Sequence, residues 1–325
     1  MHEDLFKNAI YKHEVISKPG NCSKKDRIHV ALCADEKYVC RVGITITSVV
    51  INNPGLSFAF HLIISSINAE DYQRLQEFGR KYDAELHLYY INIEIFNLMP
   101  TAFSVATYYR FLVPKALQGI SKEVLYLDAD LICLSSLKEI RDLDITNCIA
   151  AVAHDVKDVT VKRIKKLGLK TGKYFNAGVM YINVGYWNQE DISNQAAYLL
   201  NQNPSLYSLF DQDALNKILE NKLIFVNERW NLLEPVMIKD IPPGTIFLHY
   251  AGRLKPWIGD SIPNRSSARY LYYHYTQLSL WNSVSLQNPT NHSDMRRYSK
   301  ALIKEGDYAK GIYWYGKYLQ AKLKH

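Results

Sequence analysis

Two carboxylates, Asp128 and Asp130, directly follow the uncharged, mostly apolar stretch Val124–Leu127. A short continuous apolar run is typical of a strand that is buried on both faces. Side chains two positions apart on a strand point to the same side, so both carboxylates should converge just beyond the strand's carboxyl end. Converging carboxylates repel each other unless a cation lies between them, and a divalent ion with oxygen ligands is the natural candidate. The alternative is a solvated strand end that caps the next helix.

A second candidate is the nonapeptide His249–Trp257, which follows the apolar run Ile246–Leu248. His249 could complete a metal site with the two carboxylates. Lys255 and the backbone N–H of Gly252 could hold a diphosphate. A single histidine is, however, more often an ordinary core residue than a ligand.

Two further motifs contain residues that suit a nucleotide. Asp35 follows the first predicted strand and could accept a base N–H, and Tyr38 could stack on the ring of the base. Arg110 could hold a phosphate or sugar oxygen with its planar guanidinium. Each motif also has a purely structural interpretation. Asp35 could cap an ordinary strand-to-helix turn, and Arg110 could cover the sheet.

Asn176 and the tripeptide Asp211-Gln212-Asp213 are candidates for contact with a sugar. Asn176 offers both a donor and an acceptor, and its small neighbours would let the backbone approach a ligand. The tripeptide begins a predicted helix, where carboxylates commonly act as caps. One or more of its members could instead face the cleft, as a sugar ligand or as the group nearest the anomeric carbon.

Alternating strand and helix patterns predict the elements that must position these residues. A mostly parallel, layered α/β domain is expected over about residues 27–260, whereas residues 1–26 are expected to form an irregular arm. Asn68 is predicted to cap a helix, and the last two strands are expected to close the sheet. The expected strands are 28–34, 57–65, 85–91, 124–127, 149–153, 179–182, 223–226 and 245–249, and the expected helices are 42–49, 69–82, 107–117, 187–200 and 213–219.

The chain has 325 residues and a formal net charge of +7, and residues 266–325 carry nearly all of that excess. This segment has nine Lys/Arg against three Asp/Glu and is rich in aromatic residues. A basic helix with aromatic residues suits an anionic membrane surface, with Lys310, Lys317 and Lys324 on one side of the last helix. The alternative is a helix that packs on the main domain with its charges in water. No nucleic-acid-binding module accompanies the charge, so no nucleic-acid partner is expected.

The five cysteines, one of which is Cys22, include no Cys-x-x-Cys pair, so neither a disulfide framework nor a zinc cluster is expected. The first 18 residues lack an apolar signal region, and no segment has the length needed to span a bilayer. We therefore expect a cytoplasmic protein without a membrane span of its own.

Taken in order, these motifs resemble those of the family-8 retaining glycosyltransferases over about residues 27–260. The resemblance implies a GT-A fold, a UDP-hexose donor (glucose or galactose), and Mn²⁺ or Mg²⁺ held by Asp128, Asp130 and His249. It implies that the donor contacts nine residues and that three residues take part in catalysis. The implied donor contacts are Ala34, Asp35, Tyr38, Arg110, Asp128, Ala129, Asn176, Gly252 and Lys255, and the implied catalytic residues are Gln212, Asp211 and Asp213.

The segment 266–325 resembles the C-terminal tail of the lipopolysaccharide core enzymes in this family. It implies a lipopolysaccharide core acceptor and a peripheral position on the cytoplasmic face of the inner membrane. The expected organisation is an arm over 1–26, a catalytic domain over 27–265, and a helical region over 266–325 that associates with membrane or acceptor. Two positions depart from the family pattern: Ala102 stands where some relatives have histidine, and Lys37 replaces a small polar residue near the base.

Retention of the α-configuration requires either a covalent intermediate or attack from the face that the leaving group occupies. By analogy Gln212 lies nearest the anomeric carbon, and an amide is a poor nucleophile, so we expect same-face substitution with Asp211 as a sugar-hydroxyl ligand. One alternative is a phosphatase of the haloacid-dehalogenase type, although its Gly-Asp-x-x-x-Asp motif does not follow. A second alternative is a nucleotide-sugar-binding protein without turnover.

Overall fold

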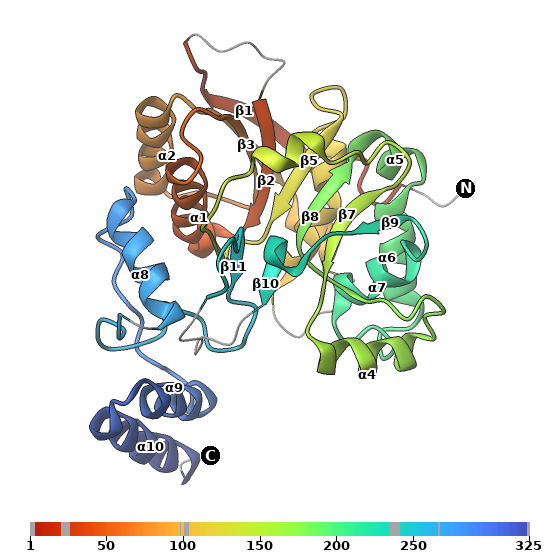
Figure 1. Cartoon of the computed structure of the whole chain (residues 1–325). Coiled ribbons are helices and arrows are strands. Elements are labelled where there is room, and N and C mark those ends of the chain that lie inside the picture. The colour runs from red at the N-terminus through yellow and green to blue at the C-terminus, as the bar shows by residue number, and fades with distance from the viewer. Residues whose placement is uncertain are drawn as a thin grey trace.

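The computed structural model describes residues 4–20, 27–97, 99–100, 104–233, 241–265 and 267–323. Its centre is an eight-stranded sheet with the order β1-β4-β3-β2-β5-β8-β7-β9, and a second sheet has the order β10-β11-β6 (Figure 1). The large sheet consists of β1 (Ile10–Ser17), β2 (Arg27–Ala34), β3 (Ser57–Ile64), β4 (Glu85–Ile91), β5 (Glu123–Leu127), β7 (Ala150–His154), β8 (Phe175–Asn183) and β9 (Leu223–Phe225). The small sheet consists of β6 (Leu131–Cys133), β10 (Leu232–Leu233) and β11 (Phe247–His249).

Helices cover both faces of the large sheet, which makes the domain a layered α/β structure, as predicted (Figure 1). Buried residues of α1, α2 and α8 pack on one face, and those of α3, α5, α6 and α7 pack on the other. The strand pairs from β4 through β3 and β2 to β5 are parallel, whereas β8 is antiparallel to β5 and β7. The helices are α1 (Val39–Ile51), α2 (Ala69–Tyr82), α3 (Val113–Ala116), α4 (Lys157–Leu167), α5 (Val184–Gln189), α6 (Ile192–Gln202), α7 (Phe210–Ile218), α8 (Ala268–Leu278), α9 (His292–Glu305) and α10 (Tyr308–Leu323).

Local sequence explains where several of these elements begin. The Asn68 side chain accepts a hydrogen bond from the Asp71 backbone N–H at 2.9 Å, so the predicted cap of α2 is confirmed. On α1, Val42, Ile46 and Val49 are all buried against the sheet, as their helical spacing predicts.

Four expectations about the elements are wrong, and the first is the single helix over 187–200, which the structure divides into α5 and α6 with Asp191 in the left-handed conformation between them. The predicted irregular arm contains β1, which pairs with β4 at the sheet edge; its side chains are largely exposed, so its sequence carries little apolar signal. The strand at β11 does not close the large sheet but pairs with β6 and β10. The predicted helix over 107–117 is a 3₁₀ helix, Val105–Leu112, followed by the short α3, which has a proline in its first turn.

The C-terminal region divides into a part that joins the core and a part that projects from it (Figure 1). After α8, Trp281 is fully buried: its indole N–H donates to Asp71 at 2.6 Å, and its ring occupies the space where Gly43 of α1 lacks a side chain. The two helices α9 and α10 pack on each other around a small cluster that includes Tyr298 and Trp314. No helix among the described residues is long and apolar enough to cross a membrane.

Candidate active site

The two central carboxylates lie in the turn between β5 and β6. β5 ends at Leu127, and the backbone N–H of Asp128 donates to the Gly178 carbonyl of β8 at 2.8 Å. The Thr45 hydroxyl of α1 lies 3.2 Å from the carbonyl oxygen of Ala129 and therefore holds the middle of the turn. The predicted convergence of both carboxylates beyond the strand end is confirmed, with the turn rather than the strand placing Asp130.

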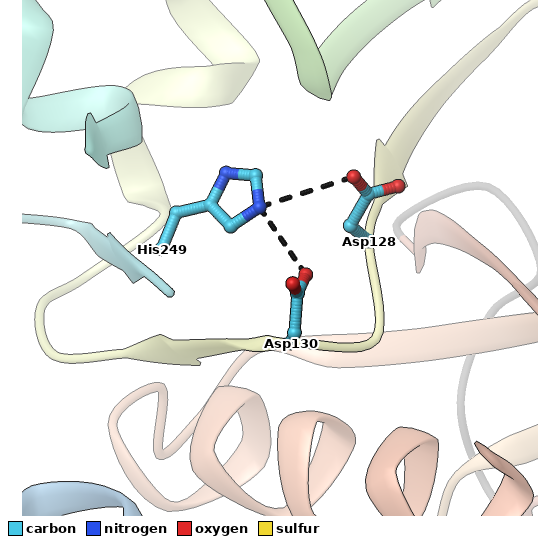
Figure 2. Close-up of side chains that lie close together, drawn as sticks. All are labelled: Asp128, Asp130 and His249. Atoms are coloured by element: carbon cyan, nitrogen blue, oxygen red, sulfur yellow. Dashed lines mark ion pairs between the residues drawn. The ribbon is translucent and has the colours of Figure 1, made fainter. Parts of the chain in front are cut away.

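His249 joins these carboxylates because β11 pairs antiparallel with β6, which places His249 opposite Leu131. Its Nε2 lies 3.2 Å from Asp130 Oδ1 and 3.9 Å from Asp128 Oδ2 (Figure 2). One ligand atom from each of the three residues lies within 4.8 Å of the other two. Two carboxylates and one imidazole form a donor set that fits a divalent cation such as Mn²⁺ or Mg²⁺.

Gly178 of β8 is necessary for this geometry. A Cβ atom at position 178 would overlap the His249 ring at Cε1 and would lie 2.8 Å from Asp128 Oδ2. The lack of a side chain at Gly178 therefore lets the His249 ring approach the backbone of β8, whereas the sequence predicted that small residues here would admit a ligand.

Lys255 and Arg110 each form an ion pair with one of the two carboxylates. The Lys255 ammonium donates to Asp130 Oδ2 at 2.6 Å and to the Tyr250 carbonyl at 2.9 Å. Burial raises the pKa of Asp130, but the positive charge of Lys255 and the hydrogen bond that it donates outweigh burial, and the net pKa lies well below the usual value. Arg110 is buried, and its guanidinium donates to Asp128 Oδ1 at 3.0 Å.

Asp211 and Gln212 line one cavity together with Asp128, Asp130 and His249. Asp211 Oδ2 forms an ion pair with Arg110 at 2.9 Å, and Asp211 Oδ1 accepts a hydrogen bond from the Thr107 hydroxyl at 2.6 Å. Burial nevertheless raises the pKa of Asp211 above its ordinary value. The Gln212 carbonyl oxygen accepts from the Asn176 amide and the Ala177 backbone N–H, both at 3.1 Å.

Asp213 lies away from these groups. Its carboxylate is fully buried, and it is held by the Arg163 guanidinium, with an Nε–Oδ1 distance of 2.8 Å, and by the Tyr174 hydroxyl at 2.7 Å. It also accepts the Leu209 backbone N–H at 2.6 Å. The structure therefore does not bring Asp213 into the cleft with Asp211 and Gln212, and direct contact with a sugar is no longer expected.

The other predicted residues line two cavities that share the carboxylates, Arg110, Gly252 and Lys255. The first cavity, of about 720 Å³, extends to the turn after β2 and contains the residues predicted to bind the nucleotide. The second, of about 570 Å³, contains Asn176, Asp211 and Gln212. The residues of the first cavity that the sequence predicted are Ala34, Asp35, Tyr38, Arg110, Asp128, Ala129, Asp130, Gly252 and Lys255.

A larger hollow of about 890 Å³ near α3, α5 and α6 contains none of these residues. Its lining has no cluster of metal ligands among the described residues, so the site is assigned from its chemistry rather than from its size.

Asp35 stabilises the turn after β2, because its side chain accepts the Tyr38 backbone N–H at 3.2 Å. The exposed Tyr38 ring forms a T-shaped contact with Trp257. The positions Ala102, Cys22 and Lys324 lie outside the described residues.

Sequence reasoning missed several residues of the site. Asn231 contacts His249, and Asp155 contacts Gln212, yet neither belongs to one of the motifs identified in the sequence. It also missed the start of α9, where Ser293, Asp294 and Arg297 line the first cavity. Only the approach of distant segments in the fold brings these side chains to the site.

Comparison with known proteins agrees with this site. Residues 29–260 match the family model described as glycosyl transferase family 8, and residues 266–322 match its C-terminal model. The chain is 32% identical to lipopolysaccharide 1,3-galactosyltransferase of Salmonella typhimurium, over 99% of each chain. It is 27% identical to lipopolysaccharide 1,2-glucosyltransferase of Escherichia coli K12, over 90% of each chain.

Solved structures show the same architecture. The crystal structure of galactosyltransferase LgtC in complex with donor and acceptor sugar analogs has a TM-score of 0.68 and 23% identity, and the match covers 79% of this chain and 96% of that chain. This likeness confirms the predicted GT-A type fold.

Proposed function

This chain belongs to glycosyl transferase family 8, and we propose that it is a metal-dependent retaining enzyme that moves glucose or galactose from a UDP-sugar to a lipopolysaccharide core oligosaccharide. The observation that carries the proposal is the cluster of Asp128, Asp130 and His249 between two cavities lined by the predicted donor-binding residues. The acceptor is inferred from the two relatives named above, which are lipopolysaccharide galactosyl- and glucosyltransferases.

The donor would lie across both cavities. Asp35 and Tyr38 would contact the base, and the hexose would reach Asn176, Asp211 and Gln212 in the second cavity. Because Lys255 carries a positive charge beside the shared carboxylates, it would contact the diphosphate at the junction of the two cavities.

The metal site would be formed by Asp128, Asp130 and His249. Mn²⁺ or Mg²⁺ held there would neutralise the diphosphate and so make UDP a better leaving group. The chain contributes Lys255 as a second positive charge, and burial of the site strengthens both interactions. With its charge neutralised in this way, the departing group needs no strong general acid.

The partners of the acidic residues favour same-face substitution. Asp213 is bound to Arg163, Asp211 is bound to Arg110 and Thr107, and the Gln212 amide is hydrogen-bonded at both its oxygen and its nitrogen. In the proposed step the bond from the anomeric carbon to the diphosphate breaks and the acceptor oxygen bonds from the same face. The departing diphosphate oxygen takes the proton of the acceptor hydroxyl. Trapping of a glycosyl adduct on Asp211 or Asp213 would overturn this route.

The C-terminal region would bring the site to a membrane-borne acceptor on the cytoplasmic face of the inner membrane. Exposed apolar and aromatic side chains recur every three or four residues along α10, which favours contact with a membrane surface. The first turn of α9 lines the first cavity, so the C-terminal region could also contact the acceptor. The exposed residues of the α10 stripe are Tyr308, Ile312, Tyr315, Leu319 and Leu323.

The test is UDP release from a panel of UDP-sugars, measured with and without Mn²⁺ and with and without lipopolysaccharide core acceptor. We expect release to require metal and acceptor, and we expect Asp128→Asn to lower it at least 100-fold by weakening the metal site. Binding of UDP-sugar without acceptor-dependent release would favour a binding protein. Hydrolysis of aryl phosphates without sugar transfer would favour the phosphatase.

A further inference from the structure

We propose that Asn231 is a positioning residue that fixes the proton of His249 on Nδ1 and thereby presents the Nε2 lone pair to a cation at Asp128 and Asp130. The inference rests on the proposed metal-dependent function, and it adds a residue that lies outside every sequence motif of the site. It follows from a chain of four amide and imidazole side chains whose orientations are set by backbone groups.

The first fixed point is Gln212. The Ala177 backbone N–H can only donate, and it lies 3.1 Å from Gln212 Oε1, so the side-chain oxygen of Gln212 must face it. The Gln212 amide nitrogen then lies 2.8 Å from Asp155 Oδ2, which accepts hydrogen bonds. Both contacts agree on one orientation of the Gln212 amide.

The second fixed point is Asn176. The Gly178 backbone N–H donates to Asn176 Oδ1 at 3.0 Å, so the Asn176 amide nitrogen is the atom that faces Gln212 Oε1 at 3.1 Å. Asn176 Oδ1 also lies 3.0 Å from the amide group of Asn231. Since an oxygen cannot donate, the Asn231 nitrogen must point to Asn176, and the Asn231 oxygen must point the other way.

The Asn231 oxygen lies 2.9 Å from His249 Nδ1. An amide oxygen only accepts, so Nδ1 must carry a hydrogen, and in a neutral imidazole Nε2 then has the free lone pair. Nε2 is the nitrogen that faces Asp128 and Asp130. Asn231 and His249 are 1% and 2% exposed, so water cannot readily replace the amide as the partner of Nδ1.

Local structure explains how Asn231 reaches this position. It ends the 3₁₀ helix Glu228–Asn231, which begins where the Asn227 side chain accepts the Arg229 backbone N–H at 3.0 Å. The following strand β10 pairs in parallel with β11, with Leu233 opposite His249. The geometry is that of an outer hydrogen-bond partner, and loss of such a partner typically weakens metal affinity 10- to 100-fold.

The first experiment measures Mn²⁺ affinity of the full chain by isothermal titration, without donor or acceptor. Asn231→Leu should weaken binding 10- to 100-fold, whereas Asn231→Asp, which keeps an acceptor for Nδ1–H but loses the donor to Asn176, should bind Mn²⁺ more tightly than Asn231→Leu. Asn53→Leu is the matched control: Asn53 is similarly buried, but its side chain bonds to Val49 and Leu137 and to none of the cluster residues, so Mn²⁺ affinity should not change. Equal affinities for Asn231→Leu and Asn53→Leu would overturn the proposal.

The second experiment reads the tautomer in metal-free wild-type protein by ¹⁵N NMR of labelled histidine, with His249→Gln to assign the signal. We expect Nδ1 to carry a proton, because it faces the Asn231 oxygen; a bare Nδ1 with a protonated Nε2 would overturn the proposal. This measurement decides the hydrogen-bond assignment even if a variant fails to fold. If wild type did not bind Mn²⁺ while the tautomer was as expected, the proposed metal-dependent function would fail and the assignment would stand.

Discussion

Asp130 is partly buried and Asp211 is buried, and both carboxylates lie beside a cation, yet their pKa values move in opposite directions. For Asp130, the positive charge of Lys255 outweighs burial and holds the pKa low, so the group stays ionised at neutral pH. For Asp211, burial outweighs the charge of Arg110 and the pKa is raised. The site thus separates a carboxylate suited to hold a cation from one suited to hydrogen-bond a sugar hydroxyl.

The contact between Gly178 and His249 leads to a prediction about metal binding. Gly178→Ala places a methyl group against the His249 ring and Asp128, and β8 cannot shift without breaking its pairing with β5. We expect Mn²⁺ affinity and sugar transfer to fall at least tenfold, measured by titration and by UDP release. The control is Gly185→Ala, where the nearest atom lies 3.6 Å from the added Cβ and both quantities should be unchanged. Unchanged Mn²⁺ binding by Gly178→Ala would contradict the assigned geometry.

The burial of Asp213 predicts a role in stability. Asp213→Asn leaves the Arg163 guanidinium buried without its counter-charge, a change that typically costs about 3–5 kcal/mol of unfolding free energy. Urea denaturation should show this loss, while the exposed control Asp142→Asn should shift stability by no more than about 0.5 kcal/mol. A stable Asp213→Asn protein that had lost sugar transfer would instead support a catalytic role for Asp213.

The sequence predicted the convergence of Asp128, Asp130 and His249 because each residue lies within three positions of the end of an apolar run. It could not predict Asn231 or Asp155, since their partners come from segments that only the folded chain brings together. It also could not separate Asp211 from Asp213: both begin α7, and the helix turns them toward different arginines.

Among the elements, β1 shows the clearest limit of sequence patterns. It lies at the edge of the sheet, where polar side chains are tolerated, so no apolar alternation marks it. β11 has the opposite problem: its apolar run is correctly predicted as a strand, but periodicity does not specify which strand it pairs with. Buried central strands such as β2, β3 and β5 were predicted well because both of their faces are covered.

Four histidines form a row across β1, β4, β3 and β2. His13 hydrogen-bonds His87 and His29 hydrogen-bonds His61, each at 2.9 Å, and the rings of His61 and His87 stack with centroids 4.5 Å apart. Burial lowers the pKa of all four, and that of His29 falls to about 4. Glu85 favours protonation of His87, but burial outweighs it.

This histidine row predicts a loss of stability in acid. The unfolded chain takes up protons below about pH 6.5, whereas the folded row stays neutral to lower pH, so stability should fall as pH drops from 6.5 towards 4. At pH 5 the share of His29 alone is on the order of 2 kcal/mol. Urea denaturation at pH 7.5, 6.0 and 5.0 would measure it. His29→Gln should reduce the pH dependence and the exposed His274→Gln should not; equal slopes for the two variants would contradict the prediction.

At the scale of the whole molecule, the C-terminal region connects the cavity to the exposed surface of the last helix. The start of α9 lines the first cavity, and α9 packs on α10 through Tyr298 and Trp314. On α10 the buried face contains Gly311, Trp314 and Tyr318, and the exposed stripe lies on another side of the helix. The exposed stripe and the first cavity are therefore connected through the packed pair of α9 and α10.

The exposed stripe of α10 can be tested by adding charge to it. Ile312 and Leu319 are 70% and 44% exposed, so their replacement with glutamate should not disturb packing. If both side chains enter the membrane interface, each contributes about 1.5–3 kcal/mol, and Ile312→Glu combined with Leu319→Glu should weaken binding to anionic vesicles at least 100-fold. Vesicle flotation measures the binding, with Val161→Glu on the exposed face of α4 as the control. Transfer to a detergent-dispersed acceptor should be unchanged in the double variant. Undiminished flotation of the double variant would show that α10 does not contact the membrane. Only the proposed contact between α9 and the acceptor would then remain.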